Sequence, residues 1–243
     1  MREEAMPALA LLAGGLATRL GKTARHVPKS LVEVAGEPFV AHQLRLLAEQ
    51  GIQDVVMCCG HLGGIVEEFV GDGMRFGCRV RYSYDGPELL GTGGAIVKAL
   101  PLLGERFWVM YGDSYLTTEF APVLREFEAQ GKQALMTVFK NEGRWDKSNV
   151  EFADGKIVRY AKGVPSDQMR YIDYGLGLYS AEAFCGWSVL GAFDLALVQS
   201  ELIARGEMAG FEVRERFYEV GSVEGLRETD AFLRERAVNG VEA

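Results

Sequence analysis

The sequence predicts an α/β fold in which a mostly parallel mixed sheet is covered by helices on both faces, as in a Rossmann-like three-layer sandwich. Strand-like apolar runs alternate with segments of helical periodicity through the first 140 residues, and parallel strands need such helical crossovers. Glycines follow several helical segments, where the chain turns back. With 243 residues, of which 48% are hydrophobic and 25% charged, we expect one globular domain over residues 1–243.

In the first half, each expected strand is a short apolar run between turn residues. These strands are expected at 8–13, 54–59, 79–84, 107–111 and 133–139. The helices carry apolar residues at three- and four-residue spacing and end at a glycine or a proline. They are expected at 39–50 before Gly51, 62–70 before Gly71, 94–100 before Pro101, and 118–130 before Gly131.

The second half departs from this alternation. Residues 149–152 and 156–160 flank Asp154-Gly155, a pair that suits the tight turn of a β-hairpin. Further strand-like segments are expected at 171–179 and 211–220, and helices at 193–205 and 223–237.

Composition excludes several classes of protein. The net charge of -8 argues against a nucleic-acid-binding surface, which normally has a basic bias. No apolar run approaches the ~20 residues that a membrane-spanning helix needs. Three histidines, and four cysteines without a Cys-x-x-Cys pair, argue against a zinc site. The short acidic segment 1–6 does not resemble a signal peptide, and free thiols suit a reducing environment, so we expect a cytoplasmic protein.

A Gly-rich turn that directly follows the first strand is the most informative local feature. Residues 11–20 read Leu-Leu-Ala-Gly-Gly-Leu-Ala-Thr-Arg-Leu, and Pro28-Lys29 follow. Backbone donors and two cations are what a nucleotide's phosphates require. Gly15 and Gly21 are separated by five residues, whereas a P-loop has four at this place. A Gly-x-Gly-x-x-Gly dinucleotide fingerprint is also absent from the turn.

This stretch resembles the signature of sugar-1-phosphate nucleotidylyltransferases, which reads Leu-Ala-Gly-Gly-x-Gly-Thr-Arg-Leu and ends in Pro-Lys. Four further segments resemble motifs of the same family in the same order, at 28–39, 91–95 (Gly-Thr-Gly-Gly-Ala), 112–114 (Gly-Asp-Ser) and 218–226. The most similar branches are short single-domain members such as heptose 1-phosphate guanylyltransferases and N-acetylmuramate 1-phosphate uridylyltransferases. The resemblance covers nearly the whole chain, from about residue 8 to about residue 233.

The resemblance implies a fold of the nucleotide-diphospho-sugar transferase type and a definite reaction. A nucleoside triphosphate and a sugar 1-phosphate would give a nucleotide sugar and pyrophosphate. Residues 7–140 would form the nucleotide-binding half, and 141–243 the sugar-phosphate-binding half. The attacking phosphate oxygen is already ionised at neutral pH, so catalysis reduces to aligning phosphates and neutralising their charge. No general base is needed, which suits a chain with three histidines.

The resemblance also implies catalytic roles for Arg19, Lys29 and Asp113, with Mg²⁺ as the cofactor. Asp113 follows a predicted strand, and ligands of open α/β sheets bind at the carboxyl ends of strands. Mg²⁺ typically takes one or two carboxylates together with phosphate oxygens and waters. Asp113 and Glu219 are the expected carboxylate ligands.

Nucleotide contacts are expected mainly from backbone and small side chains, because glycine lets a ligand approach the main chain. The candidates are Leu12, Ala13, Gly14, Gly15, Thr18, Glu88, Gly91, Thr92 and Gly93. Thr92 has the alternative role of capping the helix that follows it. Glu88 is either an acceptor for a donor edge such as guanine's or an exposed loop acid.

Lys162, Asp173 and Gly175 are the expected sugar-phosphate contacts. Three positions depart from the family's pattern, namely Ala17 for Gly, Ala161 for an acidic residue, and Glu219 for Asp. Because Arg19, Lys29 and Asp113 are present, we expect an active enzyme.

Two other functions stay open. One is a catalytically silent, nucleotide-sugar-binding regulatory subunit of the same fold. The other is a glycosyltransferase that uses a finished nucleotide sugar, although Asp113-Ser114-Tyr115 lacks the second acid of an Asp-x-Asp turn. The base, the sugar and the oligomeric state are not identified by the sequence.

Overall fold

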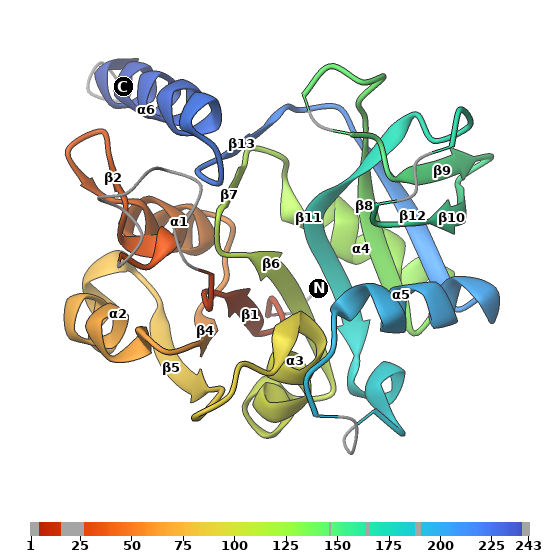
Figure 1. Ribbon diagram of the computed structural model, residues 1–243, viewed down its shortest axis with the longest axis horizontal. Helices are drawn as coiled ribbons and strands as arrows, with labels where there is room; N and C mark the ends of the chain where they lie inside the picture. Colours follow the sequence, from red (N-terminus) through yellow and green to blue (C-terminus); the bar gives the residue numbers. More distant parts are fainter. Residues whose placement is uncertain (1–4, 16–26, 146, 164–165, 188–190, 240–243) are drawn as a thin grey trace.

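A nine-stranded sheet runs through the described part of the molecule, with two small two-stranded sheets beside it (Figure 1). The computed structural model describes residues 5–15, 27–145, 147–163, 166–187 and 191–239. The large sheet consists, in spatial order, of β5 (Arg79–Tyr84), β4 (Asp54–Cys59), β1 (Leu9–Leu12), β6 (Arg106–Tyr111), β11 (Tyr171–Ser180), β8 (Ala134–Lys140), β12 (Met208–Val213), β10 (Lys156–Tyr160) and β9 (Val150–Ala153). The expected α/β class is confirmed.

Most strands of this sheet point the same way. β5, β4, β1 and β6 are mutually parallel, and β12 is parallel to β8. β11 lies antiparallel between β6 and β8, and β10 lies antiparallel to β12 and β9. Since the carboxyl ends of β1, β4, β5 and β6 meet at one edge, the segments that follow these strands gather there.

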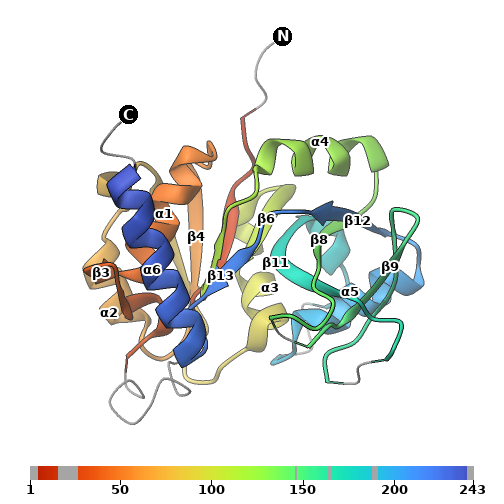
Figure 2. The ribbon, with the colours of Figure 1, turned by 90° about the horizontal axis from the view of Figure 1, so that it is seen from above.

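Helices cover both faces of the sheet (Figure 2). Side chains of α1 (Phe39–Glu49), α2 (Gly63–Val70) and α4 (Phe120–Gln130) join one hydrophobic core, and those of α3 (Gly91–Leu103) and α5 (Leu195–Ala204) join the other. β1 shows the division, because Leu9 and Leu11 belong to the first core and Ala10 to the second. None of the helices in the described ranges combines the length and apolar character needed to cross a bilayer.

A third, smaller core attaches the carboxyl-terminal helix α6 (Val223–Asn239) to the outside of α1. Leu233 of α6 is buried in one cluster with Leu46 of α1. The ring of Tyr218 stacks on that of Phe232, with centroids 4.0 Å apart. This packing fixes the segment that leads into α6, which contains Glu219.

The expected strand at 211–220 is wrong in extent. The chain leaves the large sheet after β12, passes through the charged residues 214–216, and forms β13 (Phe217–Glu219). β13 pairs antiparallel with β7 (Ser114–Leu116), a strand that the sequence did not predict. A second unpredicted pair, β2 (Glu33–Val34) and β3 (Glu37–Pro38), forms the other small sheet.

The expected stop of a helix at Pro101 is also wrong, because α3 runs from Gly91 to Leu103. Pro101 lies in the last turn, where it removes one N–H donor and only two helical residues follow it. Leu103 beyond it is buried in the second core, which holds the last residues in the helix. The expected hairpin at Asp154-Gly155 is confirmed by β9 and β10, with positive φ at both turn residues.

The first turn of α3 packs tightly against the segment that leads into α5. A Cβ added to Gly93 would lie 2.2 Å from the ring of Phe193. The N–H of Gly93 donates to the carbonyl oxygen of Phe193 at 3.0 Å. A side chain at position 93 must therefore displace a buried aromatic ring.

Gly93→Ala is expected to lower the free energy of unfolding by about 1–3 kcal/mol, because the added methyl overpacks this contact. Gly64→Ala is the matched control, since Gly64 is also helical and a Cβ there would meet nothing within 4 Å. The control should be neutral or stabilising by up to about 1 kcal/mol. Urea denaturation measures both, and equal stability of the two variants would contradict the packing described.

Candidate active site

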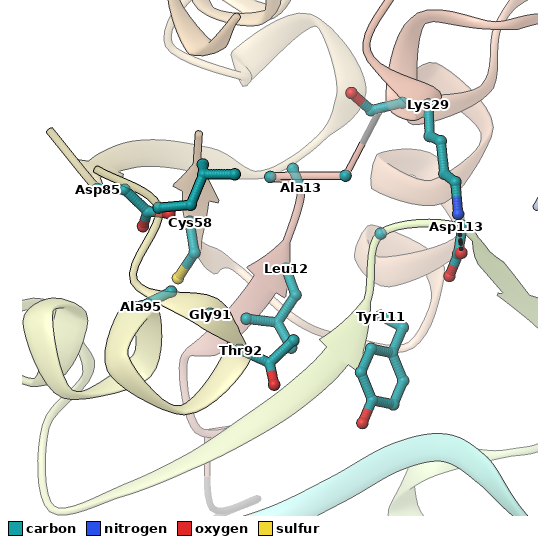
Figure 3. A pocket seen from close by; sticks show the side chains of 15 residues that line it. Leu12, Ala13, Lys29, Cys58, Asp85, Gly91, Thr92, Ala95, Tyr111 and Asp113 are labelled. Carbon is teal, nitrogen blue, oxygen red and sulfur yellow. Dashed lines mark hydrogen bonds and ion pairs between the residues drawn. The ribbon is translucent and has the colours of Figure 1, made fainter. Parts of the chain in front are cut away.

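A cavity of about 290 Å³ opens where β1, β4, β5 and β6 end. Two carboxylates of its lining, Asp85 and Asp113, follow the strands β5 and β6 (Figure 3). It is lined by Leu12, Ala13, Gly14, Gly15, Lys29, Ser30, Cys58, Asp85, Leu89, Gly91, Thr92, Ala95, Tyr111, Gly112 and Asp113. We call it the first cavity.

A larger and more polar second cavity, of about 620 Å³, adjoins the first. Its walls come from β11, from β13 with the start of α6, and from Arg144, Trp145 and Asn149. Lys29, Tyr111 and Asp113 line both cavities. The two cavities therefore meet at these three residues.

An ion pair stands at this meeting point. The Nζ of Lys29 donates to Oδ2 of Asp113 at 2.9 Å, and the two side chains are 20% and 32% exposed. Lys29 begins a 3₁₀ turn over residues 29–31, and its N–H donates to the carbonyl oxygen of Gly15 at 3.1 Å. The Gly-rich turn after β1 and the Pro28-Lys29 segment are thus joined directly.

Asp113 is held by close backbone contact with β1. The N–H of Gly112 donates to the carbonyl oxygen of Leu12 at 3.1 Å. A Cβ on Gly112 would come within 2.5 Å of that oxygen, so this position needs glycine. From the other side, the buried side chain of Gln43 in α1 donates to the carbonyl oxygen of Ser114 at 2.8 Å.

Glu219 is brought to the same point by the small sheet that the sequence did not predict. β13 pairs Glu219 with Ser114, and the N–H of Val220 donates to the carbonyl oxygen of Asp113 at 2.9 Å. The carboxylate of Glu219 accepts hydrogen bonds from the N–H of Gly221 and the hydroxyl of Ser222.

The geometry at Gly221 shows how near the three charged groups lie. A Cβ built on Gly221 would be 2.6 Å from Oε2 of Glu219 and 3.4 Å from both Oδ2 of Asp113 and Nζ of Lys29. One ammonium and two carboxylates therefore surround a single small space.

This donor set fits Mg²⁺ bound together with substrate phosphates. No group of three or more His, Cys, Asp or Glu side chains suited to a metal ion occurs among the described residues. Two carboxylates are nevertheless what Mg²⁺ commonly takes from a protein when phosphates and waters supply the other ligands. Asp113 and Glu219 are hard oxygen donors at the point where the two cavities meet.

The structure places most of the expected nucleotide contacts in the first cavity but not all of them. Leu12, Ala13, Gly14, Gly15, Gly91 and Thr92 line it. Glu88 is exposed and does not line it. Gly93 does not line it either, since it packs on Phe193 as described above. Thr18, Arg19 and Ala17 lie outside the described residues.

Thr92 caps a helix, but not its own. Its hydroxyl oxygen accepts a hydrogen bond from the N–H of Leu195 at 2.8 Å, at the start of α5. The cap of α3 is Leu90, which has no side-chain cap hydrogen bond. Thr92 therefore joins the first cavity to the start of α5, which Asp194 caps.

The three expected sugar-phosphate contacts, Lys162, Asp173 and Gly175, all line the second cavity. Lys162 donates to both carboxylate oxygens of Asp194, at 2.8 and 3.1 Å, and its Nζ lies 5.7 Å from the ring centroid of Tyr111. Burial raises the pKa of Asp194, but the hydrogen bonds from Lys162 and from the N–H of Ala196 outweigh it, so the pKa is lowered overall.

A bulge in β11 directs Asp173 and Gly175 toward the second cavity. The register against β8 shifts between Asp173 and Gly177, and Gly175 has φ of +90°. Oδ1 of Asp173 accepts from the N–H of Gly175 at 3.0 Å. Burial raises the pKa of Asp173, and this hydrogen bond and the charge of Lys162 only partly oppose that change.

Several site residues were missed from the sequence. Asp85 follows β5 as Asp113 follows β6, so the same position after a strand could have found it. Gln43 and Asp194 were missed because the residues they contact in the site, Ser114 and Lys162, are distant in the chain.

The chain is similar to known proteins over most of its length. A family model described as nucleotidyl transferase matches residues 9–149. N-acetylmuramate alpha-1-phosphate uridylyltransferase of Neisseria meningitidis serogroup B is 26% identical over 225 residues, which cover 91% of this chain and 96% of the relative. D-glycero-alpha-D-manno-heptose 1-phosphate guanylyltransferase of Campylobacter jejuni is 30% identical over 111 residues, which cover 46% of this chain and 49% of the relative.

Among solved structures, a putative glucose-1-phosphate thymidylyltransferase from Bacillus anthracis superposes with a TM-score of 0.81. The match covers 95% of this chain and 96% of that chain, at 23% identity. At this identity the likeness shows the shared fold.

The thiol of Cys58 lines the first cavity, but burial raises its pKa far above the ordinary value. Burial also raises the pKa of Cys59 to about 12 and that of Cys78 to about 11. A thiol with a raised pKa stays protonated and unreactive at pH 8. Brief treatment of the folded protein with iodoacetamide at pH 8 should therefore modify the exposed Cys185 alone.

Mass spectrometry of the intact protein counts the modified thiols, and denaturation in urea should raise the count to all four cysteines. Rapid modification of Cys58 in the folded protein would show that its thiol is not held protonated in the wall of the first cavity, and would contradict the prediction.

Proposed function

This chain belongs to the nucleotidyl transferase family, and we propose that it joins a nucleoside monophosphate from a nucleoside triphosphate to a sugar 1-phosphate, releasing pyrophosphate. The observation that carries the proposal is the meeting of two cavities at one ion pair, Lys29 and Asp113. A reaction between two phosphorylated substrates needs two binding spaces that touch where the phosphates react.

The triphosphate occupies the first cavity and the sugar phosphate the second. An oxygen of the sugar phosphate attacks the α-phosphorus, a new P–O bond forms, and the bond to the β-phosphate breaks. The electron pair leaves with pyrophosphate. Lys29 reaches both cavities, so its ammonium stabilises the charge that builds up between the attacking and leaving oxygens.

Asp113 and Glu219 would hold Mg²⁺ beside Lys29. When bound, the ion supplies positive charge to the phosphates and fixes their orientation. The role of Arg19 as a second phosphate contact is part of the same proposal. Lys162 and Asp173 would bind the sugar phosphate and the sugar hydroxyls in the second cavity.

In this proposal, each half of one domain binds one of the two substrates. Residues 7–140 contain the strands whose ends form the first cavity, and residues 141–243 contribute most of the second. Glu219 belongs to the second half and Asp113 to the first, so the proposed ion site lies between the two halves.

A pyrophosphate-release screen tests the function. The chain is incubated with Mg²⁺, each of five nucleoside triphosphates and a panel of sugar 1-phosphates. Release that requires both substrates supports the proposal. Tight triphosphate binding without release on any pair would contradict it and favour a silent binding subunit. Consumption of a finished nucleotide sugar would favour a glycosyltransferase.

Lys29→Ala and Asp113→Asn should each lower kcat by about 100-fold or more, because each removes a group aimed at the reacting phosphates. Lys156→Ala is the matched control, since Lys156 is exposed at the start of β10 and lines neither cavity. Turnover is measured by coupled pyrophosphate detection, and circular dichroism checks the fold. Near-full activity of either site variant would remove it from the catalytic centre.

Glu219→Gln should raise the Mg²⁺ concentration needed for half-maximal rate by about tenfold or more, because an amide is a weaker ligand than a carboxylate. Glu224→Gln is the control, since Glu224 lines the same cavity but pairs with Arg227. Rates are measured across a magnesium titration. An unshifted titration for Glu219→Gln would exclude it as a ligand.

A further inference from the structure

The first cavity contains a second carboxylate, far from the ion pair, that the proposed reaction does not use. Asp85 immediately follows β5, and its N–H donates to the carbonyl oxygen of Cys59 at 2.9 Å. Asp113 follows β6, which is three strands away in the order β5-β4-β1-β6. At about 4.8 Å per strand, the two positions are separated by roughly 14 Å.

Figure 3 shows this arrangement, with Asp85 on one side of the cavity, Lys29 and Asp113 on the other, and Leu12 and Ala13 between them. With its phosphates at Lys29, an extended nucleotide would bring its base to the end of the cavity where Asp85 lies. Around Asp85 the wall is largely apolar, formed by Cys58, Leu89 and Ala95.

The carboxylate of Asp85 has unused acceptor capacity. Its Oδ2 accepts one hydrogen bond, from the N–H of Leu90 at 3.1 Å. Lys98 lies nearby, but its ammonium donates to the main-chain oxygen of Asp85 and not to the carboxylate. Two carboxylate oxygens can accept about four hydrogen bonds, so further donors can bind here. Burial raises the pKa of Asp85, and hydrogen bonds from a ligand would stabilise its charged form.

A carboxylate that only accepts hydrogen bonds discriminates among bases by their donors. Guanine presents two adjacent donors, N1–H and the 2-amino group. Uracil and thymine present one N–H between two carbonyl oxygens, and a carboxylate repels these oxygens. Adenine and cytosine present an amino group beside a ring nitrogen that is itself an acceptor. Among the described residues, no Asn, Gln, Arg or His side chain lines this cavity to serve such mixed edges.

We infer that the triphosphate used by this chain is GTP, and that Asp85 is the residue that selects guanine. This inference rests on the proposed function, because it deepens the role of the same cavity. The sequence pointed to Glu88 for a related contact, but Glu88 is exposed and lies outside the lining of the cavity. Asp85, three residues earlier, has the same carboxylate chemistry and also lines the cavity.

Isothermal titration with Mg²⁺ and single nucleotides tests the inference without knowledge of the sugar. GTP should bind more tightly than UTP, dTTP, CTP and ATP. ITP, which lacks only the 2-amino group of GTP, should bind about ten- to a hundredfold more weakly than GTP, since a charged hydrogen bond is lost. This comparison uses the unmodified chain and therefore does not depend on the folding of a variant.

Asp85→Asn keeps an acceptor for the N–H of Leu90 but replaces one oxygen with a donor. The variant should lose at least about tenfold in GTP affinity and in the preference for GTP over UTP. Glu88→Gln is the matched control and should leave both unchanged. Tighter binding of another triphosphate, equal binding of GTP and ITP, or unchanged selectivity in Asp85→Asn would each overturn the inference.

The pyrophosphate screen distinguishes failure of the guanine assignment from failure of the proposed function. Release with a triphosphate other than GTP would leave the reaction standing and remove the assignment of guanine. If no triphosphate binds, both fail together.

Discussion

The ion pair between Lys29 and Asp113 is the contact on which the rest of the site depends. Its partners are 84 residues apart. Asp113 lies just beyond the end of β6, and Lys29 is joined to the segment after β1 by the hydrogen bond from its N–H to Gly15. The sheet brings these ends to one edge, and the two cavities share the pair as a common wall. Positive and negative charge are thus positioned before any substrate arrives, which is how preorganised charge lowers a barrier for phosphate chemistry.

Glycines around this pair serve different physical purposes, although they look alike in the sequence. Gly112 lets Asp113 approach the backbone of β1, and Gly221 leaves open the space between three charged groups. Gly93, by contrast, is required by the ring of Phe193. The motif at 91–95 suggested ligand binding from the sequence, but its third residue, Gly93, serves helix packing instead. Of its first three residues, only Gly91 and Thr92 line the first cavity.

The elements with strong periodicity could be predicted from the sequence, and so could the residues that follow strands. The strands β4 and β5 lie within the expected bounds, and Asp113, which the resemblance named, follows the expected strand β6. The short strands β7 and β13 could not be predicted. Each has only three residues, too few to show a hydrophobic period, and their pairing joins segments that are distant in the chain. Gln43 and the pairing of Asp194 with Lys162 were missed for the same reason, since both depend on contacts between distant segments.

Direct transfer between two substrates that meet at Lys29 and Asp113 is tested most sharply by stereochemistry at the α-phosphorus. The measurement uses a nucleoside 5′-(1-thiotriphosphate) of defined configuration with the sugar 1-phosphate found in the screen, and phosphorus NMR of the product. A single in-line attack across the shared wall gives inversion of configuration. Retention would require an intermediate on the protein and would contradict the direct transfer that the two adjoining cavities imply.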